Sequence, residues 1–397
     1  MLGEHPILVV FLAAVAAPLI AQTRAGARVP VVVFEVLLGV LLGPHVLGLI
    51  GDGVFIRLMH DAGMVAVMFM AGMEMDFALI RGRPLKLAVA GWGLSLAIAA
   101  LALAVIHPAL GIKTPPMLVI ALTTTGLGTL LPILRDGRLL GSPFGAMLLA
   151  AGTLGEVGPI VAASLAVSTR YSTWQEFALL LLFLALIALA AATGAGLRPP
   201  RLIALLARTM HASTQLPVRL ALLLLAVLVF LSEQFGFESV FGAFAAGMIV
   251  GIATRGPDGE DFRKKIDAVC FGWFAPFFFV GTGIAFDPGA FGGSLGTLLL
   301  VPALLALLLL TRGTPAWLYR RDLPRPQLLP LALCSSVSSL GIVVVIANVG
   351  RRSGHLQAHV AQALIGAALL SLLIYPTAAR VLLARREGAI DDPSHEP

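Results

Sequence analysis

Charged residues are scarce in this 397-residue chain, and their scarcity excludes a water-soluble fold. Only 12% of the residues are Asp, Glu, Lys or Arg, whereas 58% are hydrophobic and the mean hydropathy is +0.97. Soluble domains carry about 25% charged residues. No soluble fold can hide so much apolar surface, so the composition predicts an integral membrane protein.

Cysteine is nearly absent, and so are the motifs of common enzyme classes. Cys270 and Cys334 both lie inside apolar stretches, which argues against a disulfide framework and a cysteine metal site. The sequence has no phosphate-binding loop, no HExxH and no CxxC. The segment GGSLG at 292–296 matches the nucleophile-elbow pattern by chance, because no predicted strand precedes it. We therefore expect neither an enzyme nor a cofactor.

Long apolar stretches fill most of the chain. Most of them are about 17–25 residues long, the length that crosses a hydrocarbon core of about 30 Å. This pattern predicts an all-α polytopic membrane protein of about thirteen transmembrane helices. The stretches cover residues 6–23, 29–49, 59–79, 86–106, 115–134, 143–168, 175–196, 217–233, 238–254, 268–286, 294–318, 327–349 and 357–383.

The basic residues predict the orientation in the membrane. With the N-terminus outside and the C-terminus in the cytoplasm, most of the 27 Lys and Arg residues fall on the cytoplasmic side. This sorting explains the net charge of +6 without a nucleic-acid partner. Arg312 lies within a span, and the basic residues left on the outer side are Arg57, Lys113, Arg170, Arg351 and Arg352.

Two segments recur about 208 residues apart. EVLLGVLLG at 35–43 places Gly39 and Gly43 opposite Gly247 and Gly251 of AFAAGMIVG at 243–251. FMAGMEMD at 69–76 and FFVGTGIAFD at 278–287 align at an offset of 209, which matches Gly72 with Gly281. The offset spans seven predicted helices, an odd number, so the pattern predicts an inverted repeat of the kind found in secondary transporters. The alternative is that these small residues only pack helices together.

Two predicted helices, 115–134 and 327–349, carry hydroxyl and glycine clusters at their centres. Such clusters tolerate unwound backbone within a membrane, and the oxygens freed there suit a hard cation. Ordinary hydrogen bonding between helices is the alternative interpretation. The residues that we expect at the breaks are Thr124, Thr125, Gly126, Gly128, Ser338, Ser339 and Gly341.

Glu156 is the principal candidate for chemistry. It lies near the centre of the predicted helix 143–168, where a carboxylate is costly and usually marks an ion or proton pathway. Burial favours the protonated carboxyl, whereas a bound cation favours the ionised form. A carboxylate that holds a proton or a monovalent cation, one at a time, is the simplest exchange device. The alternative is a protonated Glu156 bonded to a neighbouring helix.

Arg312 is the only basic residue that we place inside the membrane. Three interpretations are open for it. It pairs with Glu156 as an internal counter-charge, it braces the interrupted helices, or its side chain extends to the nearby membrane surface.

The segment RVPVVVFEVLLGVLLGPHVLGLI at 28–50 resembles the opening motif of the Kef-type and NapA-type monovalent cation:proton antiporters. Four further segments fit this superfamily in order along nearly the whole chain. They are MFMAGMEMD at 68–76, TTTGLGTLLPILRD at 123–136, GAFAAGMIVG at 242–251 and APFFFVGTGIAFD at 275–287.

The resemblance implies a homodimer in which a core domain moves like an elevator against a dimer scaffold. The two interrupted helices would cross within that core. The implied division is scaffold at 1–80 and 215–290, core at 81–170 and 291–386, a linker helix in 171–214, and a short cytoplasmic tail at 387–397.

The sequence departs from the superfamily at the implied ion site. Where relatives carry an Asp-Asp, Asn-Asp or Gln-Asp pair, this chain has Gly155 and Glu156. The basic residue of the family falls at Arg312, and Ser338 and Ser339 stand where a Gly-Glu is common. With a single acidic group, an electroneutral one-for-one exchange is expected.

These observations lead to one main hypothesis and two alternatives. The chain exchanges Na+ or K+ for protons across a bacterial cytoplasmic membrane, with Glu156 binding the cation or the proton and Thr125 completing the cation shell. In the first alternative the same scaffold transports an organic solute that Arg312 binds, and Glu156 carries only the proton. In the second, the chain is a membrane subunit that transports nothing.

Overall fold

The computed structural model is all-helical in the part of the chain that it describes, and no strand occurs there. Its described residues divide between two compact units, which we treat separately. The structure describes residues 6–23, 30–51, 53–74, 82–110, 116–126, 130, 134, 139, 141–167, 214–235, 237, 239–254, 259–287 and 295–390.

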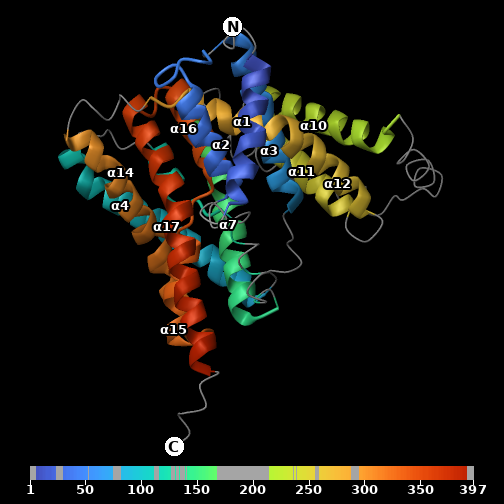
Figure 1. Ribbon diagram of the computed structural model, residues 1–397. Helices are drawn as coiled ribbons and strands as arrows, with labels where there is room; N and C mark the ends of the chain where they lie inside the picture. The colour runs from blue at the N-terminus through green and yellow to red at the C-terminus, as the bar shows by residue number, and fades with distance from the viewer. Residues whose placement is uncertain are drawn as a thin grey trace, which may run out of the picture. The chain divides into compact units, whose positions relative to one another are not determined.

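The first unit is built around α3, which packs against α11 and α13 (Figure 1). A π-helical turn, η3, joins α12 to α13 without a break in the helical path. Apolar side chains of α1 and α13 form a shared core with Ile50 and Ile56. The helices of this unit are most of α1 (Pro6–Ala21) and α2 (Val31–Leu42), with α3 (Val54–Glu74), α10 (Leu216–Gln234), α11 (Ser239–Ala253), α12 (Glu260–Val269), η3 (Cys270–Phe274) and α13 (Ala275–Ile284).

The second unit carries the candidate site. Its longest helix, α17, packs against α14, α15 and α16, and α14 runs beside α4 (Figure 1). An ion pair between Arg83 and Asp322 ties the start of α4 to the loop after η5. The elements are α4 (Arg83–Leu110), α5 (Pro116–Ala121), α7 (Pro143–Val167), α14 (Leu295–Gly313), the 3-10 helix η5 (Thr314–Arg321), α15 (Arg325–Ser335), α16 (Leu340–Arg352) and α17 (Ala358–Ile390).

Within the described residues, seven helices are long and apolar enough to cross a membrane, and α15 with α16 forms an eighth span bent by 45°. Three shorter apolar helices, α1, α2 and α11, add to these. The chain is therefore a multi-pass membrane protein, as its composition predicts. The predicted helix 175–196 lies outside the described residues, so the total of thirteen stays a prediction.

Glycines bring α2 and α13 together backbone to backbone. A Cβ on Gly39 would lie 2.2 Å from the carbonyl oxygen of Val280, and a Cβ on Gly283 would lie 2.1 Å from that of Val36. Real Cβ atoms do not approach heavy atoms within 3.0 Å, so any larger residue at either position would force the helices apart. Small residues are the usual means of such close helix packing in membranes.

The helices α3 and α11 are also packed backbone to backbone at glycines. A Cβ on Gly247 would lie 1.9 Å from the carbonyl oxygen of Phe69, and a Cβ on Gly72 would lie 2.1 Å from that of Phe244. One turn further along, a Cβ on Gly251 would meet the backbone of Met73 at 2.6 Å.

The two sets of contacts match, with one spacing between α2 and α11 and another between α3 and α13. Gly39 and Gly247 are 208 apart, and the carbonyls that they meet, Val280 and Phe69, are 211 apart. Gly72 therefore corresponds to Gly283 rather than to Gly281, the partner that the sequence pattern predicts. The matched contacts support the internal repeat, while the opposite membrane orientation of its copies stays a prediction.

Substituting Gly247→Ala is expected to destabilise the protein. The new methyl would overlap the Phe69 carbonyl, and relieving such overpacking costs about 1–3 kcal/mol. The matched control is Gly93→Ala in α4, where no atom lies within 4 Å of the place that the new methyl would take and alanine favours the helix by about 0.5–1 kcal/mol. Thermal unfolding in detergent should rank Gly93→Ala above Gly247→Ala, and equal midpoints would contradict this account of the packing.

Candidate functional site

Two helix interruptions in the second unit meet at the candidate site. After α5 ends at Ala121, residues 122–126 leave the helix, and α15 and α16 are separated at residues 336–339. The backbone N–H of Gly126 donates to the Val337 carbonyl at 2.7 Å, which joins the two breaks directly. Both interruptions fall at the hydroxyl and glycine clusters from which the sequence predicts them.

Side chains of the two breaks also bond to each other. The Thr125 hydroxyl donates to the Ser335 carbonyl oxygen at 2.5 Å. The hydroxyls of Thr124 and Ser338 share a hydrogen bond of 2.8 Å, and all four of these residues are buried. Peptide groups released from helices must find partners inside a membrane, and these bonds supply several of them.

The second break is further held by α17. The backbone N–H of Ser338 donates to the Ser371 hydroxyl at 3.1 Å, and this hydroxyl donates in turn to the Ala368 carbonyl at 2.7 Å. Ser371 has no exposed surface.

Arg312, near the end of α14, braces the first break. Its Nε donates to the Thr125 hydroxyl at 2.8 Å, one terminal nitrogen donates to the Ser95 hydroxyl of α4 at 3.2 Å, and the other donates to the Ala151 carbonyl of α7 at 2.9 Å. Only 3% of its surface is exposed, so the side chain does not extend to the membrane surface. The structure therefore shows bracing and excludes the extended side chain, whereas the role of counter-charge to Glu156 stays a prediction.

Gly155 of α7 fits tightly between Thr125 and Arg312. Its carbonyl oxygen accepts the Thr125 backbone N–H at 2.9 Å. A Cβ on Gly155 would lie 2.6 Å from the Thr125 hydroxyl oxygen and 2.8 Å from a terminal nitrogen of Arg312. The glycine thus makes room for a guanidinium and a hydroxyl at the position where the resembled antiporters carry an Asp, Asn or Gln.

Glu156 follows Gly155 in the same helix and is 6% exposed. The three hydrogen bonds of the Arg312 guanidinium all end on neutral oxygens. The described residues contain no cluster of three or more His, Cys, Asp or Glu that could hold a metal ion. Any cation bound here would thus depend on the Glu156 carboxylate and on neutral oxygens.

The remaining predicted residues divide into two groups. Ser339 is the last residue of the second break and Gly341 lies in the first turn of α16, whereas Gly128 falls outside the described residues. Gly39, Gly43, Gly247 and Gly251 belong to the first unit and pack helices, so they take no part in the site described here.

Sequence reasoning missed several polar residues that complete the site. Ser95 and Ser371 come from helices that carry no break, and Thr311 donates from α14 to the Leu122 carbonyl at 2.8 Å. A single hydroxyl in an apolar helix gives no signal of its own, because the partner that makes it informative lies far away in the sequence.

Comparisons with known proteins point to one family. Residues 7–385 match the family profile described as sodium/hydrogen exchanger, transmembrane. The Na+/H+-K+ antiporter GerN of Bacillus cereus is 23% identical over 370 residues, which cover 91% of this chain and 92% of GerN. The solved sodium proton antiporter MjNhaP1 of Methanocaldococcus jannaschii has a TM-score of 0.66 at 18% identity, over 97% of this chain and 99% of MjNhaP1. The chain thus shares the fold of MjNhaP1.

Other relatives are considerably longer. YjbQ of Bacillus subtilis is 23% identical over 96% of this chain, and the chain spans 63% of the length of YjbQ. The chain spans 36% of cation/H+ antiporter 18 of Arabidopsis thaliana, at 27% identity.

Proposed function

Because the chain belongs to the sodium/hydrogen exchanger family, we propose that it exchanges Na+ or K+ for protons across a membrane. The observation that carries the proposal is the buried carboxyl residue Glu156 of α7. It directly follows Gly155, whose carbonyl oxygen accepts the backbone N–H of Thr125 in the first break. Members of this family are transporters rather than enzymes. The named functions of relatives such as GerN agree with exchange of cations for protons.

The proposed mechanism is competition at Glu156. In a setting poor in water, a carboxylate that binds neither a proton nor a cation is costly, so Glu156 holds one or the other. Binding of one displaces the other, and movement of the site between the two sides of the membrane then couples their fluxes. One carboxylate that exchanges one proton for one monovalent cation moves no net charge, which supports electroneutral exchange.

The hydroxyls at the breaks have two proposed roles. The Thr124 and Ser338 hydroxyls, 2.8 Å apart, are oxygen ligands of the kind that a hard cation accepts. The Thr125 hydroxyl donates to Ser335 and accepts from Arg312, so a cation bound to its remaining lone pair would lie close to the positive guanidinium. We therefore assign Thr125 first to positioning, and Arg312 to fixing the break next to Glu156.

We further propose that the second unit is the moving core and that the first unit is the scaffold of a homodimer. The concentration of polar bonds in the second unit and of backbone-to-backbone helix packing in the first supports this division. We place the N-terminus outside and the C-terminus in the cytoplasm, because most of the basic residues then face inward.

Exchange by the purified protein in proteoliposomes tests the function. A pH gradient is imposed, and Na+, K+ or Li+ is added outside while an internal dye reports the pH. We expect at least one of these cations to dissipate the gradient, and to do so at the same rate when valinomycin and K+ clamp the membrane potential. No response to any cation, together with a response to an organic solute, would support the organic-solute alternative instead.

A further inference from the structure

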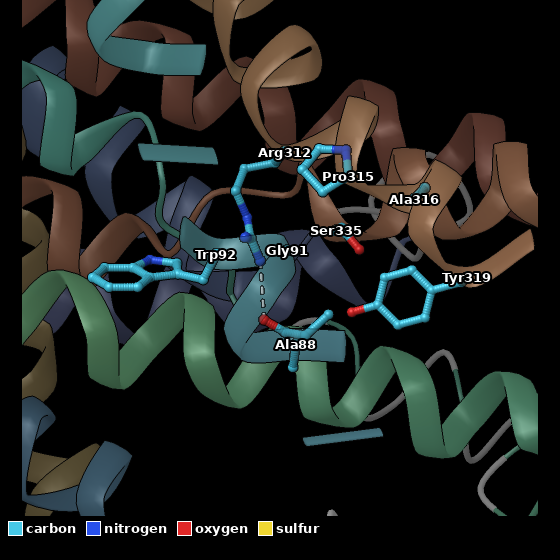
Figure 2. A pocket seen from close by; sticks show the side chains of 9 residues that line it. Ala88, Gly91, Trp92, Arg312, Pro315, Ala316, Tyr319 and Ser335 are labelled. Carbon is cyan, nitrogen blue, oxygen red and sulfur yellow. Dashed lines mark hydrogen bonds between the residues drawn. The ribbon is translucent and has the colours of Figure 1, made fainter. Parts of the chain in front are cut away.

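A small cavity adjoins Arg312 on the side of η5. Its volume is about 10 Å³, enough for about one water molecule. It is lined by Gly91 and Trp92 of α4, Ala151 of α7, Ser335 of α15, Arg312 and Tyr319. Figure 2 shows the guanidinium of Arg312 and the ring of Tyr319 extending toward this space.

Polar groups at the cavity have unused hydrogen-bonding capacity. The guanidinium carries five N–H groups, of which the three bonds described above use three. Tyr319 is only 3% exposed, and Trp92, another lining residue, has a buried Nε1–H without a hydrogen-bond partner among the described residues. A cavity with room for a water and polar partners on two sides is the setting in which buried water is found.

Arg312 and Tyr319 come from successive helical elements that both border the cavity. The two residues are seven apart, and α14 ends at Gly313, where the 3-10 helix η5 follows. A 3-10 run of 8 residues is unusually long, because such runs seldom exceed about four residues, and longer ones often mark hinges. Pro315 at the start of η5 also lines the cavity.

We propose that Tyr319 and Arg312 share a bound water in this cavity, and that Tyr319 thereby positions Arg312 and tunes the cation affinity of the exchange site. The inference rests on the proposed function. The water gives the remaining N–H groups an acceptor on the η5 side. Without it, the guanidinium turns toward oxygens nearer the breaks, its positive charge approaches the cation, and cation binding weakens.

Two substitutions remove the shared water in different ways. Tyr319→Phe deletes only the hydroxyl. Gly91→Ala adds a methyl at the cavity wall, 3.7 Å from the Tyr319 hydroxyl oxygen and 3.6 Å from the Pro315 Cβ, which are ordinary contact distances. The Gly91 carbonyl, which accepts the Ser95 hydroxyl, is unchanged. We expect each variant to raise the KM for Na+ or K+ about threefold to tenfold, with kcat within about twofold of wild type, as for loss of an interaction that acts on binding alone.

The matched control is Tyr375→Phe. This buried tyrosine belongs to the same unit, but its hydroxyl donates to the Leu305 carbonyl at 2.6 Å rather than to a cavity. Its substitution should lower the unfolding temperature slightly and leave KM unchanged. An increase in KM for Tyr319→Phe alone, for all three variants, or for none would overturn the shared-water proposal.

A second readout does not depend on transport. Radiolytic hydroxyl-radical labelling marks side chains beside bound water, so wild-type Tyr319 should be labelled and the Gly91→Ala protein should lose most of that label. An unlabelled Tyr319 in wild type overturns the water site whether or not exchange occurs. A labelled Tyr319 in a protein that exchanges no cation would instead overturn the proposed function, and with it the role in affinity.

Discussion

Replacing Glu156 by Gln is expected to reduce cation:proton exchange to the background of protein-free vesicles. Gln has nearly the same size as Glu and can keep a hydrogen bond, but it cannot take up or release a proton near neutral pH and attracts a cation only weakly. Because a single residue serves both substrates in the proposed mechanism, both half-reactions are lost together. Dissipation of a pH gradient by Na+ or K+ in proteoliposomes measures the loss.

The matched variant Glu156→Asp separates charge from geometry. It keeps the carboxylate and shortens the side chain by one methylene, giving the residue that the resembled antiporters carry at this position. We expect this variant to exchange, with an altered KM for the cation. Glu156→Gln should remain folded, because it keeps the volume and the polar character of the buried side chain. Exchange by folded Glu156→Gln at the wild-type rate would remove Glu156 from the mechanism.

The helix breaks could be predicted from the sequence because their signal is local. Thr124, Thr125 and Gly126 follow one another, as do Ser338 and Ser339, and consecutive hydroxyls or glycines within an apolar span favour an interrupted helix. The meeting of the two breaks, through Gly126 and Val337, was implied only by the resemblance to a family.

The partners of Arg312 could not be predicted, because they come from three other elements. Ser95 has no sequence signal in α4, and the Ala151 carbonyl is a backbone group that any residue would supply. The sequence therefore left three interpretations of Arg312 open, and only its burial and its hydrogen bonds distinguish them.

The register of the internal repeat shows a similar limit. Gly281 and Gly283 are two residues apart, and either aligns acceptably with Gly72. The choice depends on which glycine touches the backbone of α2, and the contact of Gly283 with Val36 decides it. From the sequence, Gly155 could be interpreted only as the loss of the polar residue that the resembled antiporters carry. The structure shows that a side chain at this position would collide with Thr125 and Arg312.

Arg312→Met should lower exchange by at least about tenfold, because it removes the buried positive charge beside the first break. The protein should remain folded, because a buried charge usually lowers stability and is kept where function needs it. Met has a similar length and fills space without a charge. The Thr125 and Ser95 hydroxyls keep their bonds to Ser335 and Gly91, so the substitution leaves few groups unsatisfied. We expect an unfolding temperature within about 2 °C of wild type, which for a chain of this size corresponds to a shift of roughly 1–2 kcal/mol or less.

Two controls test whether the charge of Arg312 or its bonding geometry matters. Thr311→Val removes the neighbouring neutral bond to the Leu122 carbonyl, so it should lose about 0.5–1.5 kcal/mol of stability and retain most exchange. Arg312→Lys keeps the positive charge, but an ammonium group cannot donate to the three acceptors in the way that the planar guanidinium does. The exchange rate of this variant should therefore lie between those of wild type and Arg312→Met. If Arg312→Met unfolds, the arginine is needed for stability rather than for transport. If that variant is folded and fully active, Glu156 and the hydroxyls at the breaks exchange ions without a fixed positive charge beside them.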